Sequence, residues 1–128
     1  MSLTDSERAL LLEGIERFNA GRFWDAHESW ETIWLNSTDP TRRFLQGMIQ
    51  LAAAFHHFKR GTLSGGIRLT EAAESKLSDF PLSHMGIDRG FAMKRAREAR
   101  LWASEQIGAG NDRQELSPER FPRLHPAP

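Results

Sequence analysis

The stretch Phe23-Trp24-Asp25-Ala26-His27-Glu28-Ser29-Trp30-Glu31-Thr32-Ile33-Trp34 decides the fold of this chain. It brings three of the four tryptophans and one histidine together with carboxylates in little more than three helical turns. At roughly 100° per residue, one face of such a helix carries only apolar side chains, namely Phe23, Ala26, Trp30, Ile33 and Trp34. A histidine at the edge of that face loses solvation unless it finds polar partners. The stretch therefore predicts a helical bundle with one polar cluster inside it.

The overall composition limits the fold and the class of partner. A chain of 128 residues is long enough for one domain with a single core. Lysine plus arginine equals aspartate plus glutamate at 17 each, so we expect neither a nucleic acid nor a membrane as partner. No apolar run reaches membrane-spanning length, the first residues do not resemble a signal peptide, and there are no cysteines. We expect a cytoplasmic protein without disulfides or thiolate chemistry.

Helix start and stop signals divide the chain into five predicted helices. Thr4 and Glu7 have the spacing of a capping box, and Asn19-Ala20-Gly21 is typical of a helix end. Asp39-Pro40 is expected to cap the third helix, with proline at its first position. Gly65-Gly66 lies inside the fourth, where we expect close backbone approach to a neighbour. After the first helix, the others are predicted at about residues 22–35, 41–60, 62–79 and 88–106.

These elements predict an all-α fold, a single bundle of four to five antiparallel helices in which the second and third are central. The bundle domain covers residues 1–107, and in its last helix Phe91, Ala99 and Trp102 are expected to face inward. Residues 108–128 form a Gly/Pro-rich tail that is either disordered or extended on the surface.

The third helix is expected to be covered on several sides, because it carries no charged side chain from Phe44 to Phe58. Its one polar strip consists of Gln46, Gln50 and His57, with Ala53 between them. A weak internal repeat relates the helix breaks on either side of this region, since Phe18-x-x-Gly21 recurs forty residues later as Phe58-x-x-Gly61. We interpret the two copies as similar corners of one bundle.

The candidate site combines the edge of the second helix with that polar strip. His27 and Glu31 are i,i+4 neighbours, within reach of a hydrogen bond or of joint coordination. With His57 they make two imidazoles and one carboxylate, a set that binds a divalent metal such as zinc or manganese with open positions. Such an ion acidifies its bound water and permits hydrolysis, with Glu28 and Glu31 as candidate catalytic carboxylates. The candidate binding residues are Gln46, Gln50, Trp30 and Trp34.

A structural role is the alternative for the same residues. His27 can be a core histidine that donates to Glu31 or Gln50, and the polar strip can simply be a solvated face. His-Glu-x-x-Glu differs from the zincin pattern His-Glu-x-x-His in its second histidine, so its specificity is low. The tryptophans have the helical spacing of core residues, and His56 is expected to be peripheral.

Two segments carry a resemblance to a known family. They are Phe18-Asn19-Ala20-Gly21-Arg22-Phe23-Trp24-Asp25-Ala26-His27-Glu28-Ser29-Trp30-Glu31-Thr32-Ile33-Trp34 and Phe44-Leu45-Gln46-Gly47-Met48-Ile49-Gln50-Leu51-Ala52-Ala53-Ala54-Phe55-His56-His57, the second closing with Arg60-Gly61. Together they resemble the small all-helical proteins of domain of unknown function 309, which are sometimes labelled predicted metal-dependent hydrolases. The resemblance implies that the motif positions are His27, Glu28, Glu31, Gln46, Gln50 and His57. It supports the fold more strongly than the function.

Three functional hypotheses remain open from the sequence. The first is a small-molecule or metal site between the second and third helices, with hydrolysis as its reaction. The second is a non-enzymatic, tetratricopeptide-like module that binds a protein and in which the polar cluster only sets helix register. A homodimer in which Trp24 and Leu35 pack against a mate is compatible with either.

Overall fold

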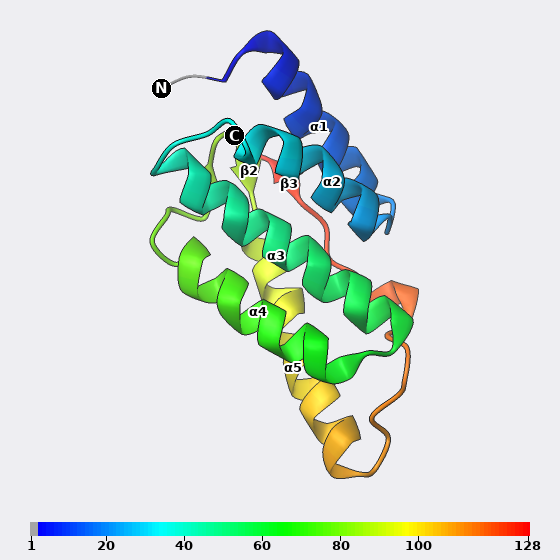
Figure 1. The fold of residues 1–128 in the computed structure, drawn as a ribbon. Coiled ribbons are helices and arrows are strands. Elements are labelled where there is room, and N and C mark those ends of the chain that lie inside the picture. Colours follow the sequence, from blue (N-terminus) through cyan, green and yellow to red (C-terminus); the bar gives the residue numbers. More distant parts are fainter. Residues whose placement is uncertain (1–2) are drawn as a thin grey trace.

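The structure, a computed structural model, describes residues 3–128 of the chain. Within this range the chain forms five α-helices, which are α1 (Asp5–Asn19), α2 (Phe23–Trp34), α3 (Thr41–Arg60), α4 (Leu63–Leu77) and α5 (Gly90–Gly108). Figure 1 shows α1 to α4 as successive antiparallel helices, with α5 behind α3 and α4. α3 packs against α2, α4 and α5, whereas α2 packs against α1 and α3. The predicted all-α bundle around the second and third helices is confirmed.

The corners of the bundle follow from its glycines. Gly21 has φ +77° and Gly61 has φ +82°, in the left-handed region that a glycine adopts without steric cost. At each corner the N–H of the next residue donates to the carbonyl five residues before it, at 2.8 Å after Gly21 and 2.9 Å after Gly61. The two copies of the sequence repeat are therefore two like corners, α1 to α2 and α3 to α4.

The core is built on α3, as its uncharged central stretch predicts. Eight of its side chains have no exposed area, namely Phe44, Leu45, Met48, Leu51, Ala52, Ala54, Phe55 and Phe58. α4 approaches this helix closely at Gly65 and Gly66. A Cβ at Gly65 would lie 3.1 Å from Nδ1 of His57, and a Cβ at Gly66 would overlap the ring of Phe58. The expectation of close backbone approach at these glycines is confirmed.

Arg89 closes the connection from α4 to α5. Its side chain is buried, and its Nη2 donates to the carbonyls of Leu77 and Phe80 at 2.6 and 2.9 Å, while Nη1 donates to that of Pro81. Leu77 is the last residue of α4, and Phe80 and Pro81 lie just after it. At this end of a helix the dipole favours a cation. Burial lowers the pKa of Arg89. The predicted cap Asp88 lies one residue before the observed cap, and its carboxylate accepts the N–H of Gly90 at 2.9 Å.

The C-terminal tail returns along the bundle in an extended form. It contains the 3-10 helix η1 (Pro118–Arg120) and strand β3 (His125–Pro126), which pairs with β2 (Ile87–Asp88); β2 also pairs with β1 (Ser83–His84). Leu116 and Leu124 of the tail are buried in the core. Asn19 binds the backbone of Leu124 twice, because its Nδ2 donates to the carbonyl at 2.9 Å and its Oδ1 accepts the N–H at 2.7 Å.

Two local predictions were wrong. Phe91 was expected to face inward, but 36% of it is exposed, because the buried face of α5 is formed by Ala92, Met93, Ala96, Ala99 and Ala103. Pro40 is the N-cap of α3 rather than its first residue, and no side chain caps this helix.

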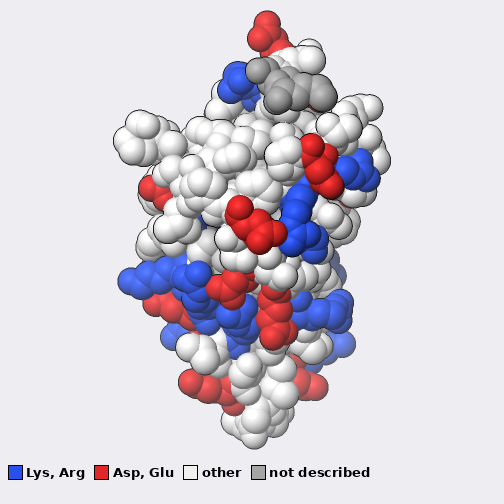
Figure 2. Space-filling model, turned by 90° about the vertical axis from the view of Figure 1, so that its left-hand side faces the viewer, with Lys and Arg blue, Asp and Glu red and all other residues white. Residues whose placement is uncertain are grey.

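On the face shown in Figure 2, acidic and basic side chains alternate. Among residues 3–128, no helix combines the length and the apolar character needed to cross a membrane.

Candidate functional site

The contacts at its two ends fix how α2 lies against α3. At one end, Nη1 of Arg42 donates to the carbonyl of Trp34 at 3.1 Å. At the other end, the rings of Trp24 and His56 lie 4.9 Å apart. The helices are antiparallel, so successive turns of α2 face successive turns of α3 in reverse order. On the outer strip of α3, His57 lies against Gly65 of α4 and Arg43 pairs with Asp79 just beyond α4. Gln50 lies at an angle between these two residues and is therefore on the α4 side of α3.

We call this line of contact the α2–α3 seam and define it by His27, Glu31 and Trp34 of α2 and Arg42 of α3. Nε2 of His27 lies 3.4 Å from Oε2 of Glu31, and the His27 side chain is only 16% exposed, against 49% for Glu31. The imidazole is stacked on Trp24, with ring centroids 4.4 Å apart and planes inclined by 16°. The carboxylate favours a proton on Nε2, which leaves Nδ1 of His27 as a hydrogen-bond acceptor.

Two polar atoms of the seam, Nδ1 of His27 and Nε1 of Trp34, are buried and have no hydrogen-bond partner among the described residues. Oε1 of Gln50, on the α4 side of α3, is a third such atom outside the seam. The other such atoms in residues 3–128 are the Nε atoms of Arg89 and Arg95, whose terminal nitrogens do donate hydrogen bonds. A buried polar atom without a partner costs roughly 1–3 kcal/mol, and native proteins contain few of them. The seam therefore contains two unsatisfied polar atoms that a bound molecule or a water can satisfy.

Several predicted site residues lie outside the seam. Trp30 is fully buried and points toward α1, because its Nε1 donates to the carbonyl of Leu11 at 3.2 Å. Glu28 is exposed and forms no ion pair with any residue from 3 to 128. His57 packs over Gly65 of α4, and burial followed by the charges of Arg68 and Arg60 lowers its pKa.

The described part of the chain contains no group of three or more histidines, aspartates or glutamates that could hold a metal ion. His27 and Glu31 lie together, whereas His57 faces α4 and does not complete a set with them. Catalytic zinc sites use three protein ligands. The residues as placed do not supply that set, so the predicted zinc or manganese site stays a prediction without geometric support.

Sequence reasoning missed the part played by His56 and Trp24. His56, expected to be peripheral, contacts Trp24, whose other neighbour is His27. Burial lowers the pKa of His56, and the nearby charges of His57, Arg60 and Lys59 lower it further. Trp24 keeps 46% of its surface exposed, although its spacing suggested a core residue. The only signal in the sequence was its position on the opposite side of the helix from Trp30.

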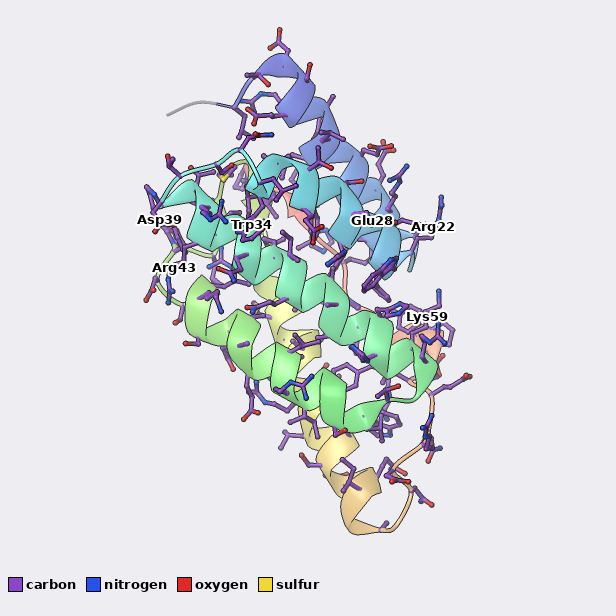
Figure 3. The ribbon with its side chains drawn as sticks, viewed as in Figure 1. Arg22, Glu28, Trp34, Asp39, Arg43 and Lys59 are labelled. Atoms are coloured by element: carbon purple, nitrogen blue, oxygen red, sulfur yellow. The ribbon has the colours of Figure 1, made fainter. Side chains whose placement is uncertain are left out.

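Trp24 and His56 line a hollow of about 1150 Å³ at the end of the bundle where the two glycine corners meet. Figure 3 shows Arg22, directly before α2, and Lys59, on α3, at this end of the bundle. Trp34, Asp39 and Arg43 lie at the opposite end. The tail closes the outer side of the hollow with Leu116 and Phe121. Phe121 packs edge-on against Phe23, with centroids 5.1 Å apart.

A comparison with known families relates the seam to a described domain. The family described as Domain of unknown function (DUF309) matches residues 11–69. Residues 11–69 are thus similar to DUF309. The match includes all of α2 and α3, so the whole α2–α3 seam lies within the DUF309 segment, while α5 and the tail lie outside it. The resemblance seen in the two sequence segments is thereby confirmed.

One relative extends further along the chain than the DUF309 match. It is described as an uncharacterized protein of Aquifex aeolicus (strain VF5) and is 30% identical over 103 residues. The alignment covers 80% of this chain but 29% of the relative, so the chain spans less than a third of that protein. The relative carries no stated activity.

Proposed function

We propose that this chain binds a small polar molecule in the α2–α3 seam. The observation that carries this proposal is the pair of buried, unpartnered polar atoms, Nδ1 of His27 and Nε1 of Trp34, two turns apart on α2. Replacing these side chains with apolar ones of similar shape would remove their desolvation cost. Their presence where the two central helices meet is better explained by a ligand than by the stability of the bundle.

The two atoms define the chemistry of such a ligand. Nδ1 of His27 is an acceptor, whereas the indole Nε1–H of Trp34 is a donor. A molecule that satisfies both carries an O–H or N–H group toward His27 and an oxygen toward Trp34. Small hydroxylated or amide-bearing molecules have this pattern. A stacked Trp24 behind His27 fixes the plane of the imidazole.

Hydrolysis at the seam is the second candidate, and the His27–Glu31 pair favours it. A carboxylate beside an imidazole orients the ring and stabilises its protonated form, as a general base requires. In this arrangement Glu31 acts on His27 rather than on a substrate. The metal-dependent form of this reaction has no ligand set in the described residues, and we derive no step through an ion.

Native mass spectrometry of untagged protein, with and without added zinc or manganese chloride, tests the proposal. We expect a bound small molecule in the wild type that is lost in His27→Phe and in Trp34→Phe, with Gln50→Met, on the α4 side of α3, as the matched control that retains it. A stoichiometric ion lost in His27→Phe would support the metal-dependent hydrolase. Protein that carries neither a molecule nor an ion under these conditions would contradict a ligand site in the seam.

A protein-interaction module of the tetratricopeptide type is the competing class, and the two like helical corners favour it. Such a module requires different residues from those that a ligand in the seam requires. A module binds through exposed side chains such as Trp24 and Leu35, which are 46% and 63% exposed. Trp34→Phe would leave such binding unchanged, whereas Leu35→Ser would weaken it.

A further inference from the structure

The hollow at the glycine corners gathers cations on its helical side. Arg22, Lys59 and Arg60 line it together with His56 and Trp24. Nζ of Lys59 donates to the carbonyl of Gly21 at 2.8 Å, so this ammonium lies directly beside Arg22. The two glycine corners therefore bring side chains from α2 and α3 into one cluster.

The charges of this cluster are only partly neutralised. Arg22 pairs with Asp25 at 2.6 Å. Among residues 3–128, no carboxylate lies within ion-pair distance of Lys59 or Arg60. An ammonium has three N–H donors, and the contact with Gly21 uses one of those of Lys59. On the other side of the hollow lie the exposed carboxylates Glu115 and Glu119 together with Arg95 of α5 and Arg123 of the tail.

An aromatic surface adjoins these cations. Trp24 stacks on His27 with one part of its indole, touches His56 with another, and still keeps nearly half of its surface exposed. Its indole is thus held by two imidazoles and remains open to the hollow. Flat rings stack on exposed tryptophan, and phosphates are held by lysine and arginine.

We propose that this hollow binds an anionic molecule with a flat ring, of the nucleoside-phosphate class. The phosphate lies on the free donors of Lys59 and on Arg60, and the ring lies against Trp24. The tail completes the site from outside with Phe121 and Leu116. This site differs from the α2–α3 seam in residues and in ligand charge, and it does not depend on the seam being occupied.

The test is a titration of the full chain with adenosine monophosphate, adenosine and inorganic phosphate at low ionic strength, followed by two-dimensional NMR. We expect the monophosphate to shift the indole signal of Trp24 and the amides of Lys59 and Arg60. We expect adenosine and phosphate to bind more weakly by about tenfold or more. Monophosphate binding that leaves these three signals in place, or equal affinity for adenosine, would overturn the proposal.

Two substitutions separate the ring from the phosphate. Arg60→Gln should weaken both the monophosphate and phosphate by about tenfold. Trp24→Ala should weaken the monophosphate by about tenfold and leave phosphate binding unchanged. Arg8→Gln on α1 is the matched control for the loss of one positive charge. If this variant lost as much affinity as Arg60→Gln, the binding would be non-specific electrostatic attraction, and the proposed site would be contradicted. Circular dichroism of each variant confirms the fold, and the wild-type shifts decide the outcome if Trp24→Ala does not fold.

Discussion

Replacing Gln50 by methionine should make the protein more stable. Oε1 of Gln50 is buried and has no partner among the described residues. Removing an unsatisfied acceptor recovers about 1–3 kcal/mol, and a change of similar volume costs less than about 1.5 kcal/mol in packing. The net expectation is a gain of about 1 kcal/mol, which raises Tm by about 3–5 °C for a domain of this size.

Urea unfolding followed by circular dichroism measures this gain in free energy. Gln46→Met is the matched control, since Gln46 lies one turn earlier on the same strip and none of its side-chain atoms is both buried and unpartnered. Its free energy of unfolding should stay within about 0.5 kcal/mol of the wild type. A loss of stability in Gln50→Met, or an equal change in both variants, would refute the reasoning, because Oε1 would then have a partner within the fold.

Three further predictions concern the rest of the molecule. Arg89→Met should lower the free energy of unfolding by at least about 3 kcal/mol, because it leaves the carbonyls at the end of α4 without donors; a change below about 1 kcal/mol in urea unfolding would contradict this. Asn19→Ala should cost about 1–3 kcal/mol and expose the tail to limited proteolysis, since Asn19 holds Leu124 by two hydrogen bonds; unchanged cleavage would show that the tail is held elsewhere. The lowered pKa values of His56 and His57 mean that the unfolded chain binds more protons than the folded one near pH 6. The free energy of unfolding should therefore fall as the pH drops through about 6.5, and His56→Gln with His57→Gln should flatten this dependence in urea unfolding measured above about pH 5.

The helices and their order were predictable because the sequence marks them locally. The capping box at Thr4 and Glu7 forms as predicted, with hydrogen bonds of 3.1 and 3.0 Å. The predicted bounds of α3 agree with the observed Thr41–Arg60, since an uncharged stretch and Gly61 define its length and its end. These features depend on neighbouring residues alone, so one sequence is sufficient to find them.

The candidate site was predictable only in part. The pairing of His27 with Glu31 follows from their i,i+4 spacing on one helix. Which histidine of α3 meets Trp24 depends on how the two helices are rotated against one another, and helix periodicity does not fix that rotation. The sequence therefore favoured His57, whereas the structure turns His56 toward Trp24 and His57 toward Gly65.

Long-range contacts of isolated residues escaped prediction for a different reason. Arg89 and the two tail leucines show no periodicity, and their partners are distant in the sequence. The composition of the tail suggested disorder or an extended surface path, but not that Leu116 and Leu124 complete the core. Such contacts are set by the closure of the whole bundle.

The most direct test of the seam is a high-resolution crystal structure of the untagged chain. The account predicts non-protein density within hydrogen-bonding distance of Nδ1 of His27 and of Nε1 of Trp34, in a seam that keeps its α2–α3 register. A seam in which these two atoms hydrogen-bond directly to protein groups, with no space between them for another molecule, would contradict it.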